Sequence, residues 1–190
     1  MMSKFKVARY LEGLKNTWDS LDIKKIEKIA ALISEAGKRG RRIFIFGNGG
    51  SAATAAHFSC DLNKCCRVQG GKRLKVVCLN DNIPAMLAYA NDDCYENVFA
   101  EQLAKYLEPQ DLVIGVSGSG NSENVLRAIR FANKNKALTI GITGFNGGKL
   151  KGIARYPLVA GLNDMQQVED THLIILHIIM KIIMVANKKR

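Results

Sequence analysis

The chain has 190 residues, 47% of them hydrophobic, which is enough to bury one full core. Its formal net charge of +11 attracts anions, but the basic residues are scattered and lack the interleaved aromatics of a single-strand binder, which disfavours nucleic acid as a partner. No secretory signal is evident, the most apolar stretch (173–185) is too short to span a membrane, and the five cysteines form no paired C-x-x-C motif, so we expect a cytoplasmic protein with reduced thiols and no membrane partner.

The predicted elements begin with two helices whose apolar residues recur every three or four positions, and from residue 42 onward strands alternate with helices. Helices are expected at 7–18, 23–36, 51–62, 84–89, 95–106, 122–134 and 166–186, and strands at 42–46, 75–79, 112–116, 137–142 and 156–159. Strands joined by helical crossovers run parallel, and nearly continuous Val, Ile and Leu indicates cover on both faces. The predicted fold class is therefore α/β, a three-layer α/β/α sandwich with a five-stranded parallel sheet. We expect one domain over residues 1–190, with two leading helices in 1–38 and the α/β core in 39–190.

Two turns rich in glycine and serine, 47–51 and 117–122, each follow a predicted strand and open a helix. Unpaired N–H groups and the helix dipole stabilise an anion at such a junction. Glycines such as Gly49 and Gly118 let the backbone approach the anion, and serine hydroxyls add donors, here Ser51, Ser117, Ser119 and Ser122. The first turn alone is equally compatible with an ordinary tight turn, whereas a plain helix cap explains only one of the three serines in the second. Neither turn fits a dinucleotide or P-loop motif, so we expect a small phosphate rather than a nucleotide.

Polar residues of two predicted helices form a second group of candidates. His57 and Asp61 lie four residues apart on one helix face, which fits an acid/base pair or two metal ligands, or else a surface ion pair. The last helix carries Glu169 and His177 within an apolar stretch, where a buried histidine needs partners for its ring nitrogens and is often a satisfied core residue. These two are eight residues apart, a rise of about 12 Å, so one ion joins them only if both side chains lean inward or come from different subunits.

These residues resemble the SIS (sugar isomerase) domain, whose sheet is flavodoxin-like, and within it the phosphoheptose isomerase group. The resemblance is carried by Gly47-Asn48-Gly49-Gly50-Ser51, His57-Phe58, Asn91-Asp92, Ser117 to Ser122, and Val168-Glu169-Asp170-Thr171-His172 with His177. It covers nearly the whole chain. It implies a homotetramer with active sites at subunit interfaces, the leading helices forming a bundle between subunits, and conversion of sedoheptulose 7-phosphate to D-glycero-D-manno-heptose 7-phosphate.

The resemblance also assigns roles to individual residues. The four serines named above are expected to grip the phosphate, and Asn48 and Asp92 to orient sugar hydroxyls. Asp61 takes the place of the base, which is usually Glu, and His177 that of its acid partner. Zinc is the expected cofactor, with ligands His57, Asp61, Glu169 and His177.

Two departures from the family pattern bear on this assignment. Asp61 shortens the arm of the base by one methylene, which weakens proton abstraction unless the backbone or a metal compensates. Glu169, where Gln is more familiar, adds a carboxylate that favours a divalent cation.

Two alternatives to this isomerase remain open from the sequence. A non-catalytic SIS protein that binds sugar phosphates, or serves as an adaptor for the bacterial replication initiator, would need the helical bundle but leaves His57, Asp61 and His177 unexplained. An isomerase of a pentulose or hexulose phosphate would differ only in the length of its pocket.

Overall fold

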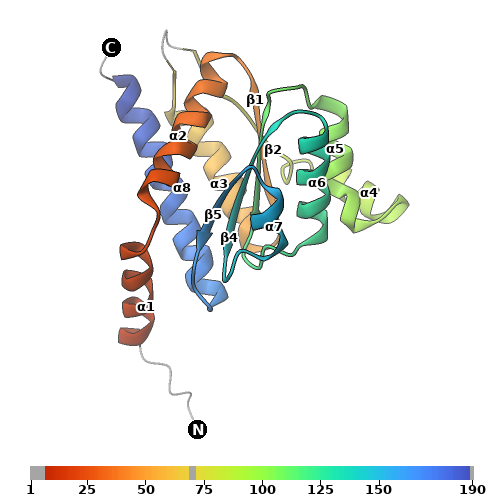
Figure 1. Cartoon of the computed structure of the whole chain (residues 1–190). Coiled ribbons are helices and arrows are strands. Elements are labelled where there is room, and N and C mark those ends of the chain that lie inside the picture. The colour runs from red at the N-terminus through yellow and green to blue at the C-terminus, as the bar shows by residue number, and fades with distance from the viewer. Residues whose placement is uncertain (1–6, 69–71, 189–190) are drawn as a thin grey trace.

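A five-stranded parallel sheet forms the centre of the molecule (Figure 1). The computed structural model describes residues 7–68 and 72–188. The strands are β1 (Arg42–Gly47), β2 (Lys75–Cys78), β3 (Leu112–Ser117), β4 (Leu138–Gly144) and β5 (Tyr156–Ala160), in the order β2-β1-β3-β4-β5. Every neighbouring pair is parallel. This flavodoxin-like order confirms the predicted fold class, and it reverses its winding between β1 and β3, where ligands bind in such sheets.

Helices cover both faces of the sheet (Figure 1). Their bounds are α1 (Val7–Asp19), α2 (Ile23–Lys38), α3 (Gly50–Cys65), α4 (Ile83–Asp92), α5 (Val98–Tyr106), α6 (Glu123–Lys134), α7 (Gly148–Ile153) and α8 (Met165–Lys188), with a short 3-10 helix η2 (Tyr95–Asn97). One core lies between the sheet and α2, α3 and α8, and a second lies between the sheet and α5, α6 and α7.

The side chains of β1 show why both faces need cover. Ile43 and Ile45 point into the core beneath α2, α3 and α8, while Phe44 and Phe46 point into the opposite core. Phe46 stacks on Phe99 of α5 with ring centroids 4.7 Å apart. Because successive side chains of a strand point to opposite faces, a strand that is apolar at every position predicts a sheet buried on both sides, as is found.

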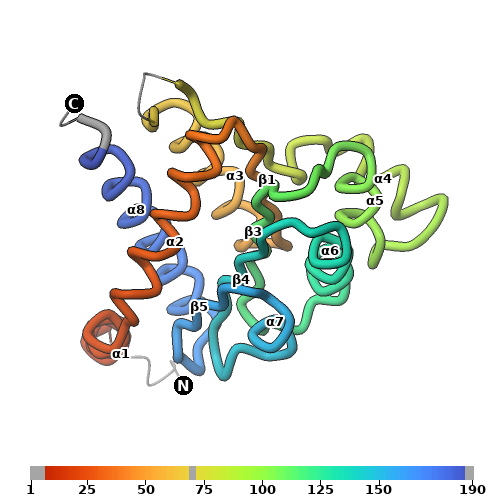
Figure 2. Tube along the Cα trace, turned by 45° about the horizontal axis from the view of Figure 1, so that its top comes forward, coloured from red at the N-terminus to blue at the C-terminus, as the bar shows by residue number. Residues whose placement is uncertain are grey.

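Helix α1 lies outside the two layers of helices and reaches the rest of the chain through α8 (Figure 2). The Tyr10 hydroxyl donates a 2.6 Å hydrogen bond to the Asp170 carboxylate, which ties α1 to the beginning of α8. This bond raises the pKa of Tyr10 to about 12.

Two local predictions were wrong in detail. The helix expected over 95–106 is divided into η2 and α5, because the chain turns from 3-10 to α-helical geometry at Val98. Helix α7 was not expected, since its six residues are too short to show helical periodicity. Within the described part of the chain, no helix is both long and apolar enough to cross a lipid bilayer.

Candidate active site

A cavity of about 250 Å³ opens at the carboxyl ends of β1 and β3, where the sheet order reverses. It is lined by Asn48, Gly49, Gly50, Ser51, Ser117, Gly118, Ser119, Ser122, Met165 and Glu169. Seven of these were expected from the sequence as phosphate or sugar ligands. The two turns, nearly 70 residues apart in the chain, thus meet in one place because β1 and β3 are neighbours with Gly47 opposite Val116.

The β1–α3 turn leaves the start of α3 without a side-chain cap. Gly49 holds the N-cap position with a φ of +52°, a left-handed conformation that favours glycine, and it has no side chain to bond the first N–H groups. Ser51 follows in the first turn of the helix and is 4% exposed. The Ala52 N–H already bonds the carbonyl oxygens of Asn48 and Gly49, so the N–H groups of Gly50 and Ser51 are the ones left for a ligand in the cavity.

The β3–α6 loop brings a second helix start to the same cavity. Ser122 is the N-cap of α6, but its hydroxyl makes no cap bond and lies 3.0 Å from the Ser117 hydroxyl instead. The Ser119 hydroxyl accepts a 3.2 Å hydrogen bond from the Asn121 N–H. Because hydroxyl groups both donate and accept, the three serines can turn donors toward an anion without rearranging the backbone.

Glu169 and Met165 reach the cavity from α8. The Glu169 carboxylate lies against Gly50, where a Cβ would overlap it, so glycine at this position permits the close approach. A carboxylate is stabilised at the positive end of α3. Met165 was not anticipated, because an apolar residue at a helix start carries no signal for a binding site.

Three further side chains converge farther along α3 and α8. The Asp61 Oδ2 atom lies 3.6 Å from Nε2 of His57 and 3.5 Å from Nε2 of His177, and the two Nε2 atoms are 3.3 Å apart. Each of the three offers a ligand atom, all within 4.8 Å of one another. His57 and His177 are 49% and 41% exposed at their side chains, so the group is open to solvent on one side.

The spacing of these three atoms matches a tetrahedral metal centre. Zinc bonds of about 2.0–2.1 Å at tetrahedral angles place neighbouring ligand atoms about 3.3–3.4 Å apart. The structure has 3.3, 3.5 and 3.6 Å, and the donors are two imidazole nitrogens and one carboxylate oxygen. Three protein ligands with one open side is the pattern of catalytic zinc sites.

Two residues do not join the groups in which the sequence placed them. Glu169 does not belong to the group of three in the structure, because eight residues of helix separate it from His177 and its carboxylate is drawn to the start of α3. Asp92 is exposed at the end of α4, accepts a 2.8 Å hydrogen bond from Asn91, and does not line the cavity.

His172 faces the interior rather than the site. Its ring is 1% exposed, and both ring nitrogens are buried without a hydrogen-bond partner among the described residues. Burial lowers the pKa of His172 to about 4, and the nearby backbone of Thr143 offsets this only in part. The ring is therefore neutral at physiological pH.

Asn124 and Tyr95 contact the site without having been anticipated. Both bond the side chain of Asn48, at 2.9 Å each. Asn124 lies two residues after the end of the 117–122 turn, which was a usable signal, and Tyr95 lies three residues after Asn91-Asp92, but nothing in the sequence indicates that either contacts Asn48.

Residues 7–144 match the SIS domain model. The chain therefore belongs to the SIS domain family. Within that family the resemblance to the phosphoheptose isomerase group is confirmed by several relatives.

A probable phosphoheptose isomerase of Thermoplasma acidophilum is 37% identical over 171 residues, covering 90% of this chain and 93% of the relative. The phosphoheptose isomerase of Aquifex aeolicus is 33% identical over 179 residues, covering 94% and 93%. The solved structure of phosphoheptose isomerase GmhA from Neisseria gonorrhoeae superposes with a TM-score of 0.85 at 25% identity, covering 93% of each chain.

Proposed function

We propose that the protein is a phosphosugar isomerase that converts sedoheptulose 7-phosphate to D-glycero-D-manno-heptose 7-phosphate. The observation that carries this proposal is a serine-lined cavity at two helix starts with a group of titratable side chains beside it on the same helix pair. His57 lies seven residues after Gly50 on α3, about 10 Å along the helix axis. An extended open-chain sugar spans this distance with its phosphate in the cavity and its first carbons at the group of His57, Asp61 and His177.

The chemistry we infer is an aldose–ketose isomerisation through an enediol. Asp61 removes a proton from C1 of the ketose while the carbonyl oxygen at C2 takes up a proton, and return of a proton to C2 with loss of the O1 proton leaves an aldehyde at C1. His177 is placed to exchange the protons of the two oxygens. Asp61 faces both imidazoles with Oδ2, so its other oxygen is left for the carbon-bound proton.

A zinc ion fits the same group of residues. His57, Asp61 and His177 would hold it, and Glu169 joins them only if its side chain leaves the start of α3. Bound there, the metal would polarise the substrate carbonyl. A carboxylate that binds a metal tightly is a weaker base. Asp61 can serve both as a ligand and as the base if one carboxylate oxygen binds the metal and the other accepts the proton.

Assembly into a homotetramer is the second part of the proposal. The outer face of α8 carries Ile174, Ile178 and Ile182, which line an apolar groove of about 470 Å³ with Trp18 and Ile23. Exposed apolar surface of this kind marks an interface, and we propose that further copies of this chain cover it. Light scattering should give four times the chain mass of 20.9 kDa, and Ile178→Asp should lower it.

Location in the cytoplasm stays a prediction. All five cysteines are free in the structure, which agrees with a reducing compartment.

The test is incubation of the purified protein with sedoheptulose 7-phosphate in D₂O, with and without added zinc. An enediol intermediate exchanges the migrating proton with solvent, so NMR should show the aldose product with deuterium at C2. Asp61→Asn keeps the size of the side chain and should abolish the product while leaving phosphate binding and assembly intact. A faster reaction of a pentulose or hexulose phosphate would reassign the substrate. Absence of product from all three sugars would overturn the isomerase and favour a binding protein or adaptor.

A further inference from the structure

The side chain of Asn48 is held from two sides at the edge of the cavity. Its Nδ2 donates to Asn124 Oδ1, and its Oδ1 accepts from Asn124 Nδ2, both at 2.9 Å. The Tyr95 hydroxyl donates to the same Oδ1 at 2.9 Å. Asn124 is 2% exposed, so its side of the amide pair is shielded from water.

One backbone group settles which way both amides face. The Val125 N–H donates to Asn124 Oδ1 at 2.9 Å. Because a backbone N–H is only a donor, the atom opposite it must be the oxygen, and this fixes the orientation of Asn124. The atom of Asn48 that faces this oxygen must then be the nitrogen, so Asn48 Oδ1 is the atom that receives the tyrosine hydroxyl.

A count of donors and acceptors shows what Asn48 has left for a ligand. An amide oxygen accepts two hydrogen bonds and an amide nitrogen donates two. Both acceptor positions of Asn48 are used, and one N–H is used. The second N–H has no partner among the described residues, and Asn48 lines the cavity. Asn48 therefore meets a ligand as a donor only.

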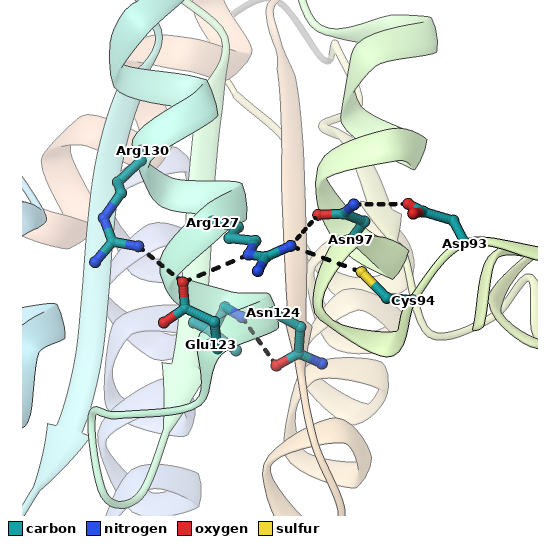
Figure 3. A network of polar contacts seen from close by, with 8 residues as sticks. Asp93, Cys94, Asn97, Glu123, Asn124, Arg127 and Arg130 are labelled. Carbon is teal, nitrogen blue, oxygen red and sulfur yellow. Dashed lines mark hydrogen bonds and ion pairs between the residues drawn. The ribbon is translucent and has the colours of Figure 1, made fainter.

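Tyr95 is half exposed and lies in η2, whose flanking residues Cys94 and Asn97 are bonded outside the cavity (Figure 3). Arg127 of α6 donates to Asn97 Oδ1 at 2.8 Å and to Cys94 Sγ at 3.6 Å, which clamps both sides of η2. Glu123 lies 3.5 Å from Arg127 and restrains the guanidinium in turn. Tyr95 therefore lies on a segment that is hydrogen-bonded to α6, the helix that also carries Asn124.

We propose that Asn124 and Tyr95 are positioning residues that lock the Asn48 amide with one N–H directed at a sugar oxygen of the bound phosphosugar. This rests on the proposed function for the identity of the ligand. The fixed donor favours a ligand that carries an acceptor oxygen on its sugar, and it gives inorganic phosphate, which has no sugar oxygen, no added affinity.

Calorimetry on the full-length protein tests this with sedoheptulose 7-phosphate and inorganic phosphate. Tyr95→Phe should weaken binding of the sugar phosphate about fivefold, the usual worth of one neutral hydrogen bond, and leave binding of inorganic phosphate unchanged. Tyr106→Phe removes a hydroxyl from another exposed tyrosine and is the matched control. In an Asn48→Ala background Tyr95→Phe should have no further effect, because it acts through Asn48. Equal weakening of both ligands, or additive losses in the double variant, would overturn the proposal.

A second measurement needs no ligand and separates this inference from the proposed function. In ¹⁵N NMR of the wild type, the Asn48 N–H that bonds Asn124 should exchange slowly with solvent, and the N–H that faces the cavity should exchange faster. Asn124→Asp places a carboxylate oxygen against Asn48 Oδ1 and should reverse or free the amide. Unchanged Asn48 signals in Asn124→Asp and Tyr95→Phe would overturn the proposal that these residues fix the amide. A wild type that binds the sugar phosphate but does not convert it would overturn only the proposed isomerase activity.

Discussion

The buried ring of His172 predicts a specific loss of stability in mild acid. The folded protein holds the ring neutral with a pKa of about 4, against 6.5 for a free histidine. Between these values the unfolded chain binds more protons, so this contribution is fully present above about pH 6.5 and is lost as the pH falls toward 4. From pH 7.5 to pH 4.5 the difference is on the order of 2–3 kcal/mol.

Urea denaturation at several pH values, at one protein concentration and with a chelator present, measures this difference. Carboxylates also titrate in this range, so the quantity of interest is the gap between the wild type and His172→Leu, which removes the buried nitrogens and keeps an apolar side chain of similar size. The pH dependence of the variant should be flatter by the amount given above. Leu176→Met, which changes a buried apolar side chain of the same helix and removes no titrating group, is the matched control and should keep the wild-type slope. Parallel pH profiles for the wild type and His172→Leu would refute the reasoning, and His172→Met repeats the test if the leucine variant fails to fold.

Three further predictions concern the cavity and the base of the sheet. Asp111→Ala should lower the free energy of unfolding by about 2–4 kcal/mol in urea denaturation, because its buried carboxylate accepts from the N–H groups of Arg42 and Glu108 at 2.9 and 3.0 Å; a change well under 1 kcal/mol would contradict this. Ser117→Ala should weaken binding of inorganic phosphate at least tenfold in calorimetry, since it removes a hydroxyl bond to a charged ligand; unaltered affinity would remove the serine from the cradle. Glu169→Gln should tighten phosphate binding about threefold to tenfold at low salt, with the gain shrinking as salt is added, because a carboxylate in the cavity repels the anion; weaker binding would show that Glu169 supports the ligand instead.

The sequence predicts the sheet, and it places the two serine-rich turns at strand ends, because both depend on local patterns. Strand β1 alternates Ile and Phe between two cores, and β3 is buried at every position, so continuous apolar runs are enough to place them. Serine and glycine just after such runs mark the helix starts. The strand order of the structure, in which β1 lies beside β3, then brings the two turns together.

Side-chain geometry between distant segments is what the sequence does not contain. Helical spacing predicts that His57 and Asp61 share a face, but their meeting with His177 depends on how α3 packs against α8. The Glu169 carboxylate lies at the start of α3 rather than with His57, Asp61 and His177, because Gly50 has no side chain to block it. Tyr95 reaches Asn48 only because η2 is clamped to α6, which no local pattern reveals.

In the proposed reaction, the phosphate is anchored in one part of the molecule and the chemistry takes place in another. The serine-lined cavity is formed by backbone groups and hydroxyls at the point where the strand order reverses. The groups that would move protons lie farther along α3 and on α8. A few substitutions on those two helices would therefore silence or redirect catalysis and still leave a receptor for phosphorylated carbohydrates. This separation favours functional divergence, because proteins with a new reaction, or with ligand binding alone, can evolve from this fold while the phosphate-binding site stays unchanged.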